Sequence, residues 1–166
     1  MLEALAVNEV DYVLIGGLAA AFHGTTRITR DIDIAYATHR ANLERICRVM
    51  NAFEPRRVVL GKPEGGVLSL TPEILKRNPA LRILTTVGEI DMLDKIEGFA
   101  TYGLVKTHAQ AGDIGFPVIV LSIEGLIKTK TALKRPKDTQ DIVELEAIRE
   151  AQSLTNSIAS TKFRLD

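Results

Sequence analysis

Tyr12-Val-Leu-Ile-Gly-Gly-Leu18 opens the part of the chain that decides the fold, and Thr29-Arg-Asp-Ile-Asp-Ile34 completes it. The apolar run before the two glycines predicts a buried strand, and the alanine-rich residues 18–23 predict a short helix. Ile32 and Ile34 then mark a second strand. The order of strand, glycine turn, helix and strand indicates an α/β or α+β fold.

Apolar patterns in the rest of the chain alternate between short strand-like runs and longer helical ones, without an internal repeat. The helices predicted from periodicity are residues 41–53, 72–76, 123–134 behind Ser122, and a segment after Pro136. The predicted strands are residues 81–85 and 88–92, followed by a hairpin of residues 105–110 and 118–121. We therefore expect one domain over residues 1–151 and a loose C-terminal tail over residues 152–166.

Composition excludes several classes of protein. The 166 residues carry 21 basic and 21 acidic side chains, so the molecule as a whole does not attract nucleic acid. One cysteine excludes an intramolecular disulfide and a cysteine-rich zinc site. The acidic N-terminal residues do not fit a secretory signal, and the longest uncharged stretch, residues 12–26, is shorter than the ~18 apolar residues that span a bilayer. We expect a soluble, cytoplasmic protein with no membrane partner.

Two carboxylates, Asp31 and Asp33, lie two positions apart on the second predicted strand. Because strand side chains alternate between faces, both project from one face, roughly 7 Å apart, while Ile32 and Ile34 face the core. Such a pair repels itself unless a cation bridges it, and Mg²⁺ binds one or two carboxylates together with substrate phosphates. The spacing alone is weak evidence, because the chain contains four acid-x-acid pairs and chance predicts roughly 2.7.

Two further features give this pair a context. Gly16 and Gly17 end one strand and open a helix, where free backbone N–H groups can bind a phosphate; a tight turn without a ligand is the alternative. Asp91 lies on a later apolar strand between Ile90 and Met92, and its alternative is an ordinary solvent-facing aspartate. The glycine turn, the aspartate pair and the third aspartate therefore have to be interpreted together.

Taken in order, Gly16-Gly17, Thr29-Arg-Asp-Ile-Asp-Ile34 and Ile90-Asp-Met-Leu93 resemble the signature of the polymerase-beta-type nucleotidyltransferases. Downstream, the segments 122–130 and 135–141 resemble the helical part of minimal bacterial and archaeal nucleotidyltransferases related to abortive-infection (type IV) toxins. The resemblance covers about residues 12–148, in four separated segments that follow the order of the family.

This resemblance implies a mixed β-sheet with packed helices and C-terminal helices. It implies that Asp31 and Asp33 hold two Mg²⁺ ions on a nucleoside triphosphate, and that Asp91 completes the metal site and helps to activate an acceptor hydroxyl. Gly16 and Gly17 would bind the phosphates. The sequence departs from the pattern at Gly17, where the wider family often has a serine whose hydroxyl contacts the phosphates.

A basic segment follows near the end of the domain. Its positive residues are Lys128, Lys130, Lys134, Arg135 and Lys137. Lysines near a helix C-terminus are favoured by the helix dipole, so a solvated helix end is the alternative to a binding site. The residues that match the family pattern are Lys130, Arg135, Lys137, Asp138 and Asp141. Because a triphosphate needs cations beyond two metals, we expect Lys130, Arg135, Lys137 and Asp138 at the nucleotide, with Lys130 and Lys137 in direct contact.

The expected function is a Mg²⁺-dependent nucleotidyltransferase that moves a nucleoside monophosphate from a nucleoside triphosphate to a hydroxyl. The resemblance leaves tRNA, a protein and a small molecule open as acceptors, and it leaves open a role as a toxin with an antitoxin protein as partner. The alternative is a catalytically silent nucleotidyltransferase-like domain that binds a nucleotide or a partner protein.

Overall fold

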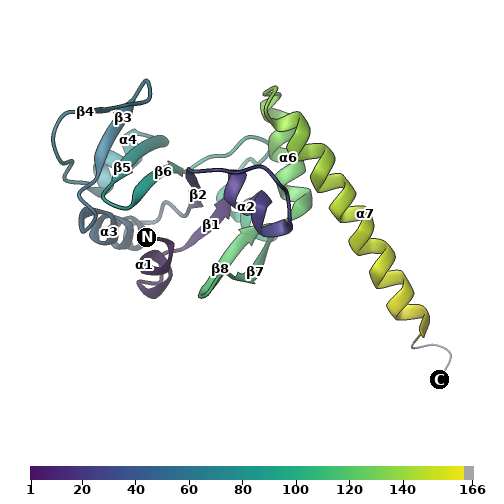
Figure 1. Cartoon of the computed structure of the whole chain (residues 1–166). Coiled ribbons are helices and arrows are strands. Elements are labelled where there is room, and N and C mark those ends of the chain that lie inside the picture. Colours follow the sequence, from purple (N-terminus) through teal and green to yellow (C-terminus); the bar gives the residue numbers. More distant parts are fainter. Residues whose placement is uncertain (163–166) are drawn as a thin grey trace.

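The computed structural model describes the backbone of residues 1–162 and the side chains of residues 1–155 (Figure 1). Helices and strands alternate along the chain, as the apolar patterns predict. The helices are α1 Leu2–Val7, α2 Gly16–His23, α3 Arg40–Asn51, α4 Pro72–Arg77, α5 Tyr102–Thr107, α6 Ile123–Leu133 and α7 Asp138–Lys162. The strands are β1 Tyr12–Ile15, β2 Ile32–Tyr36, β3 Arg56–Val59, β4 Lys62–Glu64, β5 Ala80–Thr85, β6 Gly88–Leu93, β7 Ala109–Asp113 and β8 Pro117–Leu121.

All the strands of the described residues belong to one mixed sheet with the order β4-β3-β5-β6-β2-β1-β8-β7. β2 pairs with β6 in parallel, and so does β1 with β8, whereas the other neighbours are antiparallel. Helices pack on this sheet, and α6 and α7 follow its last strand (Figure 1). The predicted α/β (α+β) class, with a mixed sheet and C-terminal helices, is confirmed.

The centre of the sheet places its two faces in different environments. Ile34 on β2, Ile83 on β5, and Ile90 and Met92 on β6 are fully buried in the core, together with the apolar stripe of α3. Since side chains alternate along a strand, the residues between them point to the opposite face. This alternation carries the acidic residues of β2 and β6 away from the core.

Local signals in the sequence explain where several helices begin and end. Ser122 caps α6, because its hydroxyl accepts a hydrogen bond from the N–H of Gly125, and Thr71 caps α4 in the same way through Ile74. Gly24 ends α2 in the left-handed conformation, with a φ of 110°. These are the boundaries at which sequence and structure agree best.

The structure corrects the hairpin that was predicted over residues 105–110 and 118–121. Residues 102–107 form helix α5, capped by Thr101, with Val105 as its buried contact. The hairpin consists instead of β7 and β8, which pair from Ala109 with Leu121 to Asp113 with Pro117. A short apolar run does not distinguish a buried strand from one helical turn, and for this reason the strand was placed too early.

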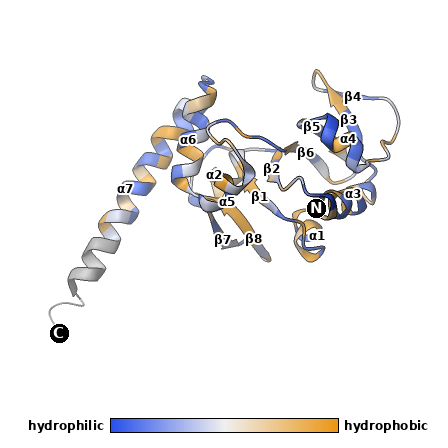
Figure 2. Cartoon of the chain, turned by 180° about the vertical axis from the view of Figure 1, so that it is seen from behind, coloured by the Kyte–Doolittle hydropathy of each residue, from blue (hydrophilic) through white to orange (hydrophobic). Residues whose placement is uncertain are grey.

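The chain after Ala151, where the sequence predicts a loose tail, continues as part of α7 to Lys162. Figure 1 shows this helix leaving the sheet and α6 and extending away from them, and Figure 2 shows apolar and polar residues alternating along the part of the helix that is coloured by hydropathy. Residues 163–166 lie outside the described residues. None of the described helices combines the length and the apolar character needed to cross a membrane.

Candidate functional site

Asp33 and Asp91 lie opposite each other on neighbouring parallel strands. In the pairing of β2 with β6, Asp33 is the partner of Asp91, flanked by the pairs Ile32 with Ile90 and Ile34 with Met92. Because paired residues share a face, both carboxylates project from the side of the sheet that is opposite to the core. The sequence therefore correctly placed these aspartates on strands, and the structure brings them together.

Asp31 occupies the residue before β2, which begins at Ile32, so it is not part of the strand on which the sequence placed it. It is half-buried and lies two positions before Asp33, directly before the first residue of β2. Within the described side chains, no three Asp, Glu, His or Cys residues are grouped closely enough to hold a metal by themselves. The described side chains thus include two neighbouring carboxylates, Asp33 and Asp91, but not a complete set of ligands for a metal ion.

The environment of Asp33 at this face raises its pKa. Burial raises its pKa to about 6, and the negative charges of Asp91 and Asp31 act in the same direction. The backbone N–H of Gly17 and the charge of Arg135 oppose the rise without cancelling it. A cation bound beside Asp33 would favour its charged form and lower this pKa.

Gly16 leaves room for the Asp33 carboxylate. A Cβ atom at Gly16 would overlap the carboxylate of Asp33, and the φ of 68° at Gly16 is one that other residues rarely adopt. Gly16 is also the first residue of α2, where backbone N–H groups have no partner inside the helix. The start of α2 therefore lies directly against the carboxylate of Asp33. A phosphate that binds at a helix start next to a metal ion would need this arrangement.

A cleft of about 310 Å³ opens in front of these residues, between the sheet and α6. The polar residues of its lining that the sequence singled out are Gly16, Asp33, Asp91, Lys130 and Arg135. Its apolar lining comes from Ile15, Ala80, Leu93, Ile96, Leu126 and Leu133. Segments that are far apart in the sequence thus meet in one concave site with an acidic floor and a basic rim.

Gly17 has a close neighbour that explains the absence of a side chain. A Cβ atom at Gly17 would lie 2.8 Å from the hydroxyl oxygen of Thr29 and 2.9 Å from its Cβ. Thr29 therefore fills the space that a serine side chain at position 17 would need. The close packing of Thr29 thus accounts for glycine at position 17.

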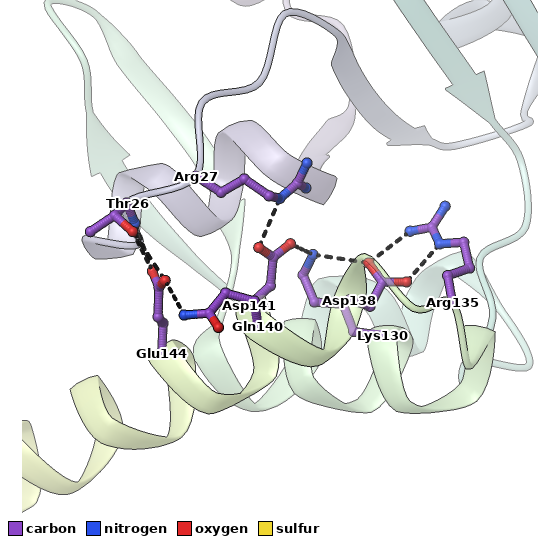
Figure 3. A network of polar contacts seen from close by, with 8 residues as sticks. All are labelled: Thr26, Arg27, Lys130, Arg135, Asp138, Gln140, Asp141 and Glu144. Carbon is purple, nitrogen blue, oxygen red and sulfur yellow. Dashed lines mark hydrogen bonds and ion pairs between the residues drawn. The ribbon is translucent and has the colours of Figure 1, made fainter.

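Lys130, expected at the triphosphate, is buried with only 3% of its side chain exposed (Figure 3). Its Nζ lies 2.6 Å from Oδ2 of Asp141 and 3.5 Å from Oδ1 of Asp138. The residue lines the cleft, but its charge is already neutralised by two buried carboxylates. The structure thus differs from the expected free ammonium group at the cleft edge.

The same two carboxylates also bind arginines from opposite ends of the sequence (Figure 3). Arg27 Nε donates to Asp141 at 2.8 Å, and Arg135 donates through Nε and Nη2 to Asp138 at 2.6 and 3.1 Å. Burial raises the pKa of Asp141, but Arg27 and Lys130 outweigh it and lower that pKa. The network joins the segment before β2 to α6 and α7.

Arg27 was missed by the sequence reasoning, and Asp138 has a different place from the one expected. Arg27 and Asp141 are 114 residues apart, so no local pattern could pair them. Asp138 is buried beneath Arg135 and does not line the cleft, whereas Arg135 does. Lys137 is exposed and lies outside the cleft lining, and it makes no ion pair within the described side chains.

Comparison with known proteins was made at the level of sequence and of structure. No protein-family model and no curated protein sequence matches the chain. The structure is similar to the lincomycin-bound lincosamide antibiotic adenylyltransferase LnuA, with a TM-score of 0.59 and 15% identity, over 89% of this chain and 92% of that one. It also matches a nucleotidyltransferase structure from Thermotoga maritima, with a TM-score of 0.47 and 15% identity, over 96% and 88%. The similarity to the lincosamide adenylyltransferase shows that the chain has the nucleotidyltransferase fold.

Proposed function

We propose that the chain is a Mg²⁺-dependent nucleotidyltransferase that transfers a nucleoside monophosphate from a nucleoside triphosphate to a hydroxyl group. The observation that carries this proposal is the register of Asp33 and Asp91, which places two carboxylates side by side on the floor of a cleft. The start of α2 and the guanidinium of Arg135 border the same cleft. Acids for metal and donors for phosphate thus converge in one place, as phosphoryl chemistry requires.

The residues fit magnesium in number and in kind. Mg²⁺ takes oxygen ligands and is usually held by one or two carboxylates together with substrate phosphates, not by a complete protein cage. Asp33 and Asp91 would supply those carboxylates, with Asp31 at the edge of the site. Burial raises the pKa of Asp33 first and the charges of Asp91 and Asp31 raise it further, whereas a bound cation would act in the opposite direction. When bound, Mg²⁺ ions, two of them in our expectation, would neutralise the charge of the triphosphate.

The side chains of the protein would then position the two reactants. We expect the backbone N–H groups of Gly16 and Gly17 and the guanidinium of Arg135 to bind phosphate oxygens, although the N–H of Gly17 also bonds to Asp33. The acceptor oxygen would form a bond to the α-phosphorus while the bond to pyrophosphate breaks in line, and the pyrophosphate leaves with the bonding electrons. We expect Asp91 to take the proton of the acceptor hydroxyl.

Lys130, Asp138 and Asp141 have an indirect part in this proposal. They form the buried network that fixes Arg135 at the rim of the cleft and binds Arg27 from the segment before β2. A guanidinium held in this way loses less conformational entropy when it binds a phosphate. Their role is therefore to position the arginines, and Lys137 would meet the nucleotide only from outside the cleft lining.

One observation favours a hydroxyl group on a small molecule as the acceptor. The solved structure of similar fold, at a TM-score of 0.59, is an adenylyltransferase described as acting on a lincosamide antibiotic. Transfer to tRNA or to a protein, and a toxin role with an antitoxin, rest on the sequence resemblance alone. The zero net charge gives no general attraction for a polyanionic acceptor.

One experiment separates the enzyme from a silent nucleotide-binding domain. The protein is incubated with each labelled nucleoside triphosphate and Mg²⁺, together with total RNA, a cell lysate or a panel of hydroxyl-bearing small molecules. Label transfer that disappears in Asp31→Ala and Asp33→Asn supports the enzyme. Nucleotide binding without transfer to any acceptor would favour the silent domain.

A further inference from the structure

Arg82 on β5 binds Asp91, the third aspartate of the site, through two hydrogen bonds. Arg82 and Asp91 are paired across β5 and β6, so their side chains share the face that opens to the cleft. Nε of Arg82 lies 2.6 Å from Oδ1 of Asp91, and Nη2 lies 2.5 Å from Oδ2. The guanidinium therefore binds both oxygens of a carboxylate that the proposed reaction needs.

The stability of the sheet does not require this pair. β5 and β6 are already joined by a continuous ladder from Ala80–Leu93 to Thr85–Gly88. The side chain of Arg82 is 44% exposed and that of Asp91 19%, and ion pairs open to solvent contribute little to folding. The significance of the pair thus lies in its position beside the other carboxylates.

Arg82 brings a positive charge to a face that is otherwise acidic. Its pKa is raised first by the hydrogen bond and charge of Asp91, and then by the charges of Asp31 and Glu89. Asp33 stands on the far side of Asp91 from Arg82, because β6 lies between β2 and β5. A guanidinium in this position neutralises part of the charge that a divalent cation would neutralise.

We propose that Arg82 is a built-in competitor of the metal: it holds Asp91 in the metal-free protein and has to release that carboxylate when a divalent cation binds. This inference rests on the proposed function, because it assumes that Asp91 is a metal ligand. A cation between Asp33 and Asp91 would be repelled by a guanidinium in bidentate contact with Asp91. The exposure of Arg82 gives its side chain room to turn away from the sheet. Arg82 is thus a positioning residue that acts through Asp91.

The test is a titration of the full chain with Mn²⁺, followed by electron paramagnetic resonance and without nucleotide. Arg82→Gln removes the competitor, so it should bind Mn²⁺ about three- to tenfold more tightly than the wild type. Arg82→Lys keeps the charge without the planar fork and should lie between the two. Arg40→Gln is the matched control, because Arg40 is an exposed arginine that pairs with Glu44 on α3, and its affinity should stay within about twofold of the wild type.

A second background shows whether the effect passes through Asp91. In Asp91→Asn the gain from Arg82→Gln should vanish, since no carboxylate remains for the two cations to share. An unchanged or weaker affinity in Arg82→Gln, or an equal gain in the Asp91→Asn background, would overturn the inference alone. If neither the wild type nor Arg82→Gln bound Mn²⁺, the proposed metal site would fail and this inference with it. Thermal melting of each variant confirms that the titrated protein is folded.

Discussion

Asp33 and Asp91 face each other in register across the parallel strands β2 and β6, although 58 positions separate them in the sequence. Asp91 is bound by Arg82 on its other side, yet the pKa of Asp33 is raised to about 6, by burial first and by Asp91 second. Two carboxylates kept close together on a rigid sheet cost folding stability unless a cation joins them.

Asp33→Asn should make the metal-free protein as stable as the wild type or more stable at pH 7. The native state holds the Asp33 proton more tightly than the unfolded chain does, because the native pKa is about 6 against an ordinary 3.8. The stability from this group is therefore complete below about pH 4 and is lost as the pH rises to about 6. The gain in the variant at pH 7 should be on the order of 1 to 3 kcal/mol.

Urea unfolding between pH 4 and pH 7, without divalent cations, measures this gain. The wild type should lose stability across that interval relative to Asp33→Asn, and the variant should also fail to bind a triphosphate in the presence of Mg²⁺. A variant that unfolds easily, or that keeps the nucleotide affinity of the wild type, would show that Asp33 has a structural role and no metal to hold.

Lys130→Ala should destabilise the fold by about 3 kcal/mol, because it leaves Asp138 and Asp141 buried with less positive charge. Lys137→Ala removes the same type of side chain from an exposed position and should change the stability by less than about 0.5 kcal/mol. Chemical denaturation at pH 7 compares the two variants. Equal stabilities would mean that the buried lysine contributes nothing to the network.

Arg135→Ala should weaken the binding of a Mg²⁺-bound triphosphate by about 1 to 3 kcal/mol, the cost of a hydrogen bond to a charged group. Arg135 lines the cleft, and its guanidinium already affects the pKa of Asp33. Lys137→Ala, outside the lining, should keep an affinity within about threefold of the wild type. Isothermal titration calorimetry distinguishes them, and a larger loss in Lys137→Ala would move the phosphate site out of the cleft.

Gly17→Ala should destabilise the protein by about 1 to 3 kcal/mol, since its new methyl group meets the side chain of Thr29. Thr29→Gly in the same chain should recover part of this loss. Gly66→Ala serves as the control, because a Cβ atom at Gly66 has no neighbour within 4 Å. Thermal unfolding is the measurement, and a Gly17→Ala variant as stable as the control would refute the close packing of Thr29 on the glycine turn.

The part of the site that could be predicted from the sequence is the part fixed by local periodicity. Alternation along a strand places Asp33 and Asp91 on the face opposite to the buried Ile34 and Ile90. The glycine turn indicates the start of a helix. For the same reason the mixed class of the fold was recognisable. β2 begins at Ile32 and so excludes Asp31. Where the strand begins depends on its pairing with the neighbouring strands, and the sequence of the strand does not show it.

The part that could not be predicted depends on contacts between distant segments. Nothing near Arg82 indicates that it binds Asp91, and nothing near Arg27 indicates Asp141, because each pair is created by the sheet or by the packing of α7. Lys130 was taken for a free cation since its position beside an apolar stripe suits a cleft edge as well as a buried ion pair. The strands β3 and β4 were missed because they are short, and most of their residues are exposed.

The most direct test of the central claim compares two labels on one nucleotide. The protein is incubated with Mg²⁺, the acceptor panel and a triphosphate labelled either at the α- or at the γ-phosphate. Nucleotidyl transfer predicts that the α-label joins the acceptor while the γ-label leaves with pyrophosphate, and that both events are absent in Asp33→Asn. Transfer of the γ-label, or nucleotide binding with no transfer of either label to any acceptor, would contradict the account.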